Sequence, residues 1–317
     1  MSSHQFSIAQ TEQVHKRINE LSKRSSEVQS RLAIPLKKLW NPVRNLACIH
    51  NLNVFSELHE RFPNFNEVIN YYENNAIALK RLDQPFEAIP VLLQGDPGLG
   101  KTYFVSELAR LFRLNFYEIS LATTTANFAI SGGSTQWGEG STGFIANSLA
   151  DSDIANPIIL LDEIDKVNSV SHYNPITPFY SLLEPHSAKR FKDEALEIEL
   201  DTSKIIWIAT SNYMSQIPEP IQSRMQVFKI EKLSVEHMPN IIKSIYQLVR
   251  NQKFYAQILN EDVSPELINY LLDKTPREIK QYFEVSVMNA IKNNRNHIVV
   301  SDLPIQKTKE VRRVGFL

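Results

Sequence analysis

The stretch that most constrains how this chain folds is the sequence GDPGLGKT at residues 95–102. An apolar run, IPVLL at residues 89–93, comes shortly before it, and a segment with helical periodicity begins near its end. This order of strand, glycine-rich turn and helix is typical of a phosphate-binding loop. Backbone N–H groups can wrap around a phosphate only where side chains leave room, which explains why glycine stands at three positions of the loop.

The other residue types in this loop indicate a nucleotide that is bound together with Mg²⁺. The ammonium of Lys101 is expected to reach the β- and γ-phosphates, and the hydroxyl of Thr102 to hold the Mg²⁺ ion. The helix that follows adds a favourable dipole at its N-terminus. The sequence therefore predicts a nucleotide-binding site made of Gly95, Asp96, Pro97, Gly98, Leu99, Gly100, Lys101 and Thr102.

A second apolar run ends in two carboxylates. Residues 158–161, IILL, show no alternation of polar and apolar side chains, which is typical of a strand buried on both faces of a parallel sheet. Asp162 and Glu163 follow this strand at its carboxyl end, where open α/β sheets bind their ligands. We expect Asp162 to hold Mg²⁺, directly or through water. Glu163 is then placed to polarise the attacking water.

A third buried strand is predicted at residues 204–209, and Asn212 follows shortly after it. An asparagine there can bind the γ-phosphate or orient the attacking water; on its own it would indicate a turn. Between residues 89 and 230 strands alternate with helices, which predicts a parallel sheet with right-handed crossovers. We therefore predict an α/β fold of the P-loop NTPase type, with helices on both faces of the sheet.

Helical patterns dominate the rest of the chain. From residue 235 onward only helices are expected, which indicates a separate small helical domain. Residues 299–303 are expected to be extended. The helices are predicted at residues 11–32, 46–59, 66–81, 235–251, 265–272 and 276–292.

The first of these helices has a seam of apolar residues. Val14, Ile18, Leu21, Val28 and Leu32 fall on alternating four- and three-residue steps, broken only at Ser25. One interpretation is a coiled coil between subunits. The other, which we favour because fewer than four heptads are present, is an amphipathic helix that packs on its own domain.

Composition excludes several classes of protein. The 317-residue chain has a net charge of −1, which gives no support for a general nucleic-acid surface. Its one cysteine, Cys48, cannot form an intrachain disulfide, and no histidine spacing resembles a metal site. No run of residues approaches the length of a membrane span, and the first residues lack an apolar signal core. We therefore expect a cytoplasmic protein without a membrane partner.

Glycine is concentrated in a second segment as well. Of the 9 glycines, five lie between residues 132 and 143, around Trp137. A tryptophan in a polar, glycine-rich loop is not in core-like surroundings. It could be an aromatic wedge on a mobile loop, or it could fold back over an apolar edge. The sequence by itself does not decide between these two interpretations.

These motifs together resemble those of AAA+ ATPases, and among them the ATPase module of Lon-type proteases. The resemblance covers residues 62–303 and rests on GDPGLGKT at 95–102, NPIILLDEIDKV at 156–167 and IATSNYMSQIPEPIQSRMQVF at 208–228. It implies ATP and Mg²⁺ as cofactors and hydrolysis of ATP to ADP and phosphate. It also implies a homo-oligomeric ring, with six subunits expected.

The resemblance assigns further residues. Arg224 corresponds to the arginine finger, which acts on the ATP of the neighbouring subunit. Arg277 corresponds to the sensor-2 arginine of the lid, although Pro276 replaces the usual small or aliphatic residue before it. Trp137, within Gln136-Trp137-Gly138, stands where the Lon-type pore loop carries an aromatic–aliphatic–glycine triplet. That match favours a role for Trp137 in gripping a protein partner.

Two departures from the Lon pattern shape the expected function. After the lid only about a dozen residues remain, so no peptidase domain is expected, and no large N-terminal recognition domain is expected either. The expected domains are an N-terminal helical region (1–61), an AAA+ α/β domain (62–232), a helical lid (233–303) and a basic, flexible tail (304–317). We expect a ring motor that remodels or unfolds an unidentified protein partner without being a protease. The alternative is a nucleotide-dependent switch or loader that organises DNA or a larger complex.

Overall fold

The computed structural model describes residues 4–134, 140–167, 173–252 and 255–304. It divides into two compact units, one formed by residues 1–97 with 101–231 and the other by residues 98–100 with 232–317. Of the tail expected at 304–317, only residue 304 belongs to the described part. Within that part, every helix falls short of the length and apolarity that a membrane span requires.

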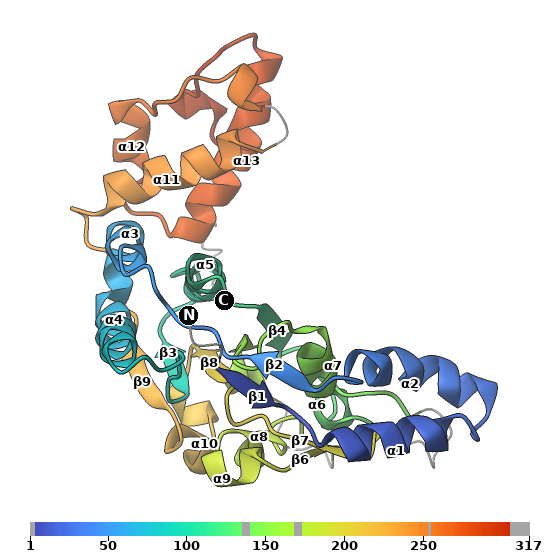
Figure 1. Cartoon of the computed structure of the whole chain (residues 1–317). Coiled ribbons are helices and arrows are strands. Elements are labelled where there is room, and N and C mark those ends of the chain that lie inside the picture. The colour runs from blue at the N-terminus through green and yellow to red at the C-terminus, as the bar shows by residue number, and fades with distance from the viewer. Residues whose placement is uncertain (1–3, 135–139, 168–172, 253–254, 305–317) are drawn as a thin grey trace, which may run out of the picture. The chain divides into compact units, whose positions relative to one another are not determined.

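A five-stranded parallel sheet forms the centre of the first unit (Figure 1). Its strands follow the order β4-β5-β8-β3-β9, so the strand before the glycine loop, β3, pairs with β8 on one side and β9 on the other. This confirms the predicted α/β fold with a parallel sheet. The strands are β3 (Val91–Gln94), β4 (Phe116–Ser120), β5 (Ile158–Asp162), β8 (Ile206–Ser211) and β9 (Gln226–Lys229).

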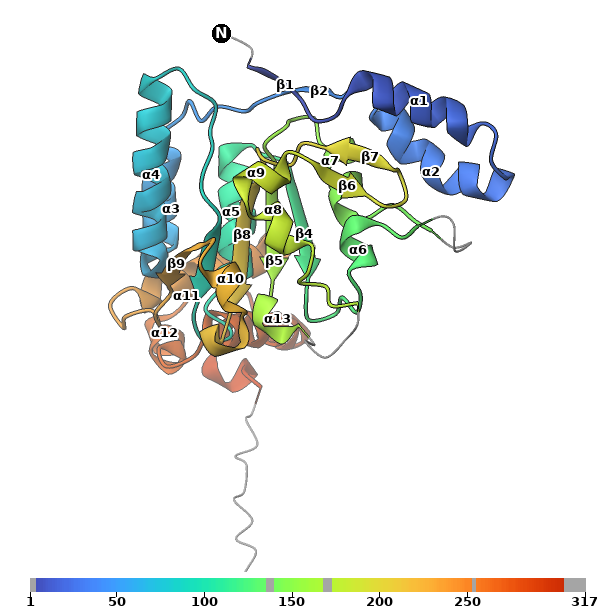
Figure 2. The same cartoon turned by 90° about the horizontal axis from the view of Figure 1, so that it is seen from below.

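The sheet core is apolar throughout and is covered by helices. Residues 158–161 of β5 and all of β8 are buried, as expected for strands with helices on both faces. Helix α5 (Lys101–Phe112) contacts β4, β5 and β8, and α3 (Val54–Arg61) packs on α4 (Asn66–Arg81) and on α5. Figure 2 shows the same unit from below, with the remaining short helices around the sheet. These helices are α6 (Phe128–Ser131), α7 (Phe144–Asp151), α8 (Phe179–Leu182), α9 (Pro185–Ala188) and α10 (Glu219–Gln222).

The single helix expected at residues 11–32 is wrong. Two helices, α1 (Thr11–Leu21) and α2 (Ser26–Lys38), pack side by side as a hairpin (Figure 1). Val14 and Leu32 are fully buried in the same cluster as the central sheet. The apolar seam therefore packs on its own unit. Pro35 lies buried inside α2, which continues to Lys38.

Two short antiparallel strand pairs were not predicted. Strand β1 (Gln5–Ser7) pairs with β2 (Val43–Asn45), and β6 (Phe191–Asp193) pairs with β7 (Ile198–Leu200). The helix expected at 46–59 begins only at Val54, because the residues before it lead out of β2. Strands of three residues are too short to show a reliable alternation of side chains.

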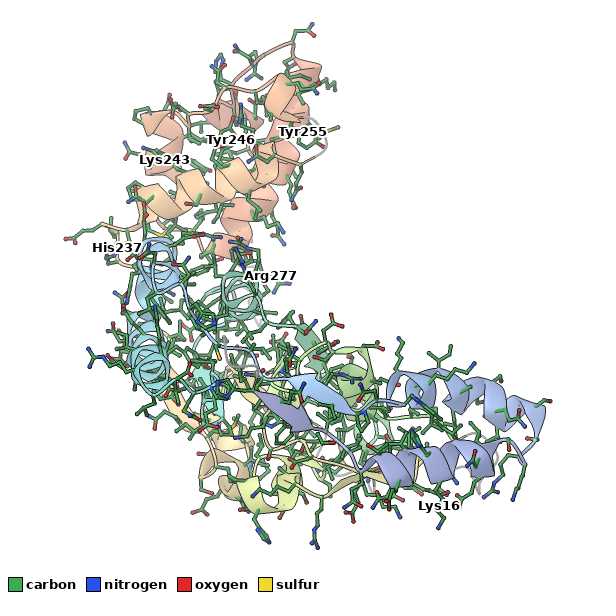
Figure 3. The ribbon with its side chains drawn as sticks, viewed as in Figure 1. Lys16, His237, Lys243, Tyr246, Tyr255 and Arg277 are labelled. Carbon is green, nitrogen blue, oxygen red and sulfur yellow. The ribbon has the colours of Figure 1, made fainter. Side chains whose placement is uncertain are left out.

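The second unit is helical. Its helices are α11 (Met238–Arg250), α12 (Pro265–Leu271) and α13 (Pro276–Lys292). The Ser264 side chain caps α12 by accepting from the Leu267 N–H, and the Tyr246 hydroxyl, inside the unit in Figure 3, donates to the Asn260 carbonyl at 2.7 Å. Residues 300–302 form a 3₁₀ turn in place of the expected extended segment, since Asp302 accepts from the Val299 N–H and pairs with Arg295.

A buried carboxylate ties the β6–β7 hairpin to the second glycine cluster. One oxygen of Asp193 accepts from the Gly143 N–H at 2.8 Å, and the other accepts from the N–H groups of Ala195 and Leu196. A Cβ atom at Gly132 would lie 2.7 Å from an Asp193 oxygen. Glycine is therefore required at this position. Burial outweighs these hydrogen bonds and raises the pKa of Asp193 to about 6.

This raised pKa makes the contribution of Asp193 to stability depend on pH. Since the carboxyl ionises at lower pH in the unfolded chain, the stability it confers is present below about pH 4 and lost as pH rises to about 6. The shift corresponds to about 3 kcal/mol. Urea titrations give the free energy of unfolding of wild type and of Asp193→Asn. The value for wild type minus the value for the variant should fall by about 3 kcal/mol between about pH 4 and 6.5. Asp201→Asn, at the end of the same hairpin, is the matched control; parallel curves for wild type and Asp193→Asn would contradict the prediction.

Candidate nucleotide-binding site

The loop at residues 95–100 makes a tight turn between β3 and α5. Gly98 and Gly100 have φ values of 84° and 86°, which L side chains rarely adopt. The Gly95 N–H donates to the Ser211 carbonyl at 3.1 Å, so the start of the loop is tied to the end of β8. The glycines at 98 and 100 thus serve backbone geometry, and the first helical residue after the turn is Lys101.

Lys101 lies at the centre of the candidate site. Its ammonium donates to the carbonyls of Gly95 at 2.6 Å and Asp96 at 3.0 Å, and to the Asn212 side-chain oxygen at 3.0 Å. Its side chain is buried, and burial lowers the pKa of Lys101, opposed by the charge of nearby carboxylates, first of which is Asp165. Two residues predicted from separate motifs, Lys101 and Asn212, are therefore in direct contact.

Asp162 and Thr102 also meet. The Thr102 hydroxyl donates to the Asp162 carboxylate at 3.0 Å, and the Thr210 hydroxyl donates to the same oxygen at 2.5 Å. Mg²⁺ prefers such oxygen ligands, and it is commonly held by one or two protein groups together with phosphates and water. The described residues contain no cluster of three acidic, histidine or cysteine ligands. Thr102 and Asp162 thus fit the Mg²⁺ ion that the loop motif implies.

Glu163 has an unusual backbone. Its φ and ψ of 56° and 48° place a non-glycine residue in the left-handed region, where strain is stored. The Glu163 N–H donates to the Thr210 hydroxyl at 2.9 Å, which helps to hold this conformation. Thr210 therefore bridges Asp162 and Glu163. The role of Thr210 was not predicted from the sequence. Its position in β8, two residues before Asn212, could have indicated that its side chain lies at the site.

Asp165 is a second residue that sequence reasoning passed over. Its side chain is fully buried, and one oxygen accepts from the Tyr213 N–H at 3.2 Å, next to Asn212. The other oxygen has no hydrogen-bond partner among the described residues. The ammonium of Lys166 lies 3.8 Å from Asp165 and over the Tyr213 ring. Asp165 thus links the segment after β5 to the segment that carries Asn212. Its place three residues after Asp162 in DEID was the available signal.

Three further residues were predicted for the site. Arg224 follows α10 and donates to the Pro220 carbonyl; its Nε atom is buried and has no partner within the described ranges. Arg277 belongs to the second unit, where it stands exposed in the first turn of α13 (Figure 3). Trp137 lies outside the described residues.

The first turn of α13 is well defined by its own capping groups. The Thr275 side chain accepts from the Glu278 N–H, while the Glu278 carboxylate accepts from the Thr275 N–H and hydroxyl, both at 2.8 Å. These bonds lower the pKa of Glu278. Pro276 occupies the first helical position, which tolerates proline. The capping box fixes the backbone on which Arg277 stands, and no hydrogen bond or ion pair holds its side chain within the part of the chain described.

The chain was compared with protein families and known proteins. Residues 91–232 match the family described as ATPase family associated with various cellular activities (AAA). Lon protease 2 of Borreliella burgdorferi is 30% identical over 65% of this chain and 27% of its own length. Lon protease of Malacoplasma penetrans is 24% identical over 82% of this chain and 32% of its own length. The chain thus spans about a quarter to a third of the length of these two relatives.

A solved structure supports the fold. A point mutant of Thermotoga maritima RuvB matches with a TM-score of 0.51 over 75% of this chain and 67% of that one, at 15% identity. At this identity the likeness concerns the fold alone. Together with the parallel sheet and the glycine loop between β3 and α5, these matches confirm the predicted resemblance. Residues 91–232 match the AAA family, and the chain resembles the ATPase module of Lon-type proteases.

Proposed function

We propose that this chain hydrolyses ATP to ADP and phosphate in a homo-oligomeric ring and uses the reaction to remodel or unfold a protein partner. The observation that carries the proposal is the convergence of four predicted residues at the carboxyl ends of β5 and β8: Lys101 contacts Asn212, and Thr102 contacts Asp162. Parallel α/β sheets bind ligands at this edge.

Each residue of the cluster has a task in phosphoryl transfer, which depends mainly on positioning and on stabilising charge. The N–H groups of residues 98–100 surround the phosphates. The Lys101 ammonium exchanges its loop carbonyls for the β- and γ-phosphates, and Asn212 orients the water or the γ-phosphate. Glu163 removes a proton from the attacking water. Thr102 and Asp162 would hold Mg²⁺, which neutralises charge that develops on the phosphates.

The site is completed by residues from elsewhere. We propose that Arg224 acts as an arginine finger on the ATP of a neighbouring copy. Its guanidinium has no carboxylate partner within the described residues, which supports this role because such a group can pair with another anion. We propose that Arg277 contacts the phosphates from the lid. The proposed domain limits remain 62–232 for the AAA+ domain and 233–303 for the lid.

The proposal is tested by phosphate release with ATP and Mg²⁺ at several protein concentrations. Wild type should release phosphate, and the activity per chain should rise with concentration because each site needs a neighbour. Lys101→Ala should lose ATP binding, while Lys37→Ala, which removes an exposed lysine on α2, should match wild type. Phosphate release by wild type no greater than by Lys101→Ala at any concentration would contradict ATP hydrolysis.

The alternative function is a nucleotide-dependent switch or loader that organises DNA or a larger complex. The resemblance to Lon proteases and the net charge of −1 favour remodelling of a protein. Trp137→Ala separates the two functions. Loss of remodelling with full ATP turnover supports a motor that grips its partner through this residue. An unchanged phenotype supports the switch.

A further inference from the structure

A polar cavity in the first unit is not used by the proposed ATP site. Its volume is about 560 Å³, within the range of ligand pockets. It lies among α6, α8, α9 and β6, four elements seen together in Figure 2. Ser131, Thr177, Ser181 and Ser187 line it together with Asn127, and the Ser131 hydroxyl donates to the Asn127 carbonyl at 3.1 Å. Phe191 and Pro178 add apolar wall.

The charge of this lining has one sign. Arg190 and Lys192 are exposed to it and His186 stands beside them, whereas the described lining contains no carboxylate. Neither Arg190 nor Lys192 forms an ion pair within the ranges that the structure covers. In a chain with a net charge of −1, two adjacent cations without an acidic partner are a local feature that attracts an anion.

The nearest acidic side chains are engaged or directed elsewhere. Glu184 accepts from the Ser187 N–H at 2.8 Å as the cap of α9. Asp193 is buried and accepts from three N–H groups of Gly143, Ala195 and Leu196. Glu194 is exposed and is not among the described residues of the lining. Glu199 stands opposite Lys192 in the β6–β7 pairing, but no ion pair joins the two side chains within the described ranges. The lining itself therefore keeps its two cations without a carboxylate.

The chemistry favours carboxylates over phosphates. Phosphate sites are typically built from several free backbone N–H groups at a glycine loop or a helix N-terminus. Here α9 begins with Pro185, which has no N–H, and the Ser187 N–H is already bound to Glu184. What remains are the guanidinium of Arg190, the ammonium of Lys192, the Asn127 amide, the His186 imidazole and separate hydroxyls. A guanidinium binds a single carboxylate through two parallel hydrogen bonds, which suits side chains spaced along a peptide.

We propose that this cavity binds an acidic segment of the protein that the ATPase remodels; the identity of the ligand as a protein rests on the proposed function. Arg190 and Lys192 pair with its Asp or Glu side chains, and the surrounding hydroxyls donate to them. Ser131 connects the cavity to the second glycine cluster, since it lines the cavity and its carbonyl accepts from the Glu194 N–H at 2.9 Å just before Gly132. An acidic segment would thus be held beside the base of that cluster.

The test uses the full chain and a fluorescein-labelled peptide of alternating glutamate and glycine, with fluorescence anisotropy as the measurement. Wild type should bind this peptide and not its glutamine or lysine counterparts. The double variant Arg190→Gln with Lys192→Gln should raise Kd at least about tenfold, because it removes two charge-assisted contacts. Added salt should weaken wild-type binding.

A charge-matched control removes two exposed lysines outside the cavity, Lys23→Gln with Lys189→Gln, and should bind like wild type. Equal Kd for the two double variants would overturn the proposal, as would tighter binding of single-stranded DNA or polyphosphate at the cavity than of the acidic peptide. Binding is measured without nucleotide, and phosphate release separately. Peptide binding without ATP hydrolysis in wild type would refute the proposed function alone. Normal hydrolysis without peptide binding would refute the cavity alone.

Discussion

Replacing Glu163 with glutamine is expected to abolish ATP turnover while leaving ATP binding intact. The amide has nearly the shape of the carboxylate and can follow the same left-handed backbone at φ 56°. It cannot accept the proton of the attacking water. Loss of a general base typically lowers a rate by about 10²- to 10⁴-fold. Phosphate release should fall by this factor, and the Kd for a fluorescent ATP analogue should stay within about twofold of wild type.

The same variant should hold the ring together. Since bound ATP is not consumed, the form in which neighbouring copies share a nucleotide persists. Sedimentation with ATP should show an assembled species for Glu163→Gln. Glu194→Gln removes an exposed acid on the β6–β7 hairpin and should behave as wild type in both measurements. Monomers of Glu163→Gln in saturating ATP would count against a shared site, even with turnover abolished.

The second large effect is expected at Arg224. Arg224→Ala should bind ATP normally, because the residue makes no contact with the loop around Lys101 within the described residues. It should lose most turnover. An arginine supplied from a neighbour is worth about 10³- to 10⁵-fold in related P-loop enzymes. Phosphate release at high protein concentration, where wild type is assembled, is the measurement that checks this loss.

Two further variants sharpen the result. Arg224→Lys keeps the positive charge but not the planar fork, so it should recover only part of the turnover. Arg81→Ala removes an exposed arginine at the end of α4 and should leave turnover unchanged. If Arg224→Ala keeps full ATP turnover, Arg224 has no part in the mechanism and is not the arginine finger.

Local patterns predicted the middle of the sheet well because β3, β5 and β8 are largely buried, whereas the outer strands β4 and β9 are partly exposed. The run at residues 158–161 has no polar residue, which is typical of a strand buried on both faces and not of an amphipathic helix or strand. The glycine loop and the pair of carboxylates could also be predicted, because each follows such an apolar strand directly. Their contacts, Lys101 with Asn212 and Thr102 with Asp162, follow once both strands are placed in one parallel sheet.

Features that depend on contacts between segments far apart in the sequence could not be predicted. The seam through Val14, Leu21, Val28 and Leu32 keeps its spacing across the turn at residues 22–25, so periodicity alone could not show that the chain reverses there. Strand β1 pairs with β2, which lies beyond the α1–α2 hairpin, through a non-local contact that no local pattern records.

Individual polar groups of the site were hidden for another reason. Asp165 is an ordinary acid in sequence, and only its burial beside Tyr213 gives it a place in the site. Glycine at 132 looked like a sign of a flexible loop. In the structure it makes room for the Asp193 carboxylate. Such roles arise from packing between segments that are far apart in the chain.

The central claim is that each ATP site is shared between two copies, and mixing two inactive variants tests it most directly. Glu163→Gln retains Arg224, and Arg224→Ala retains Glu163. In a mixed assembly, a site with Glu163 from one copy and Arg224 from its neighbour is complete. Phosphate release should therefore reappear when the two are combined, with a maximum near equal amounts, although each alone is inactive. A mixture that stays as inactive as its components at every ratio, under conditions where both assemble, would contradict the shared site.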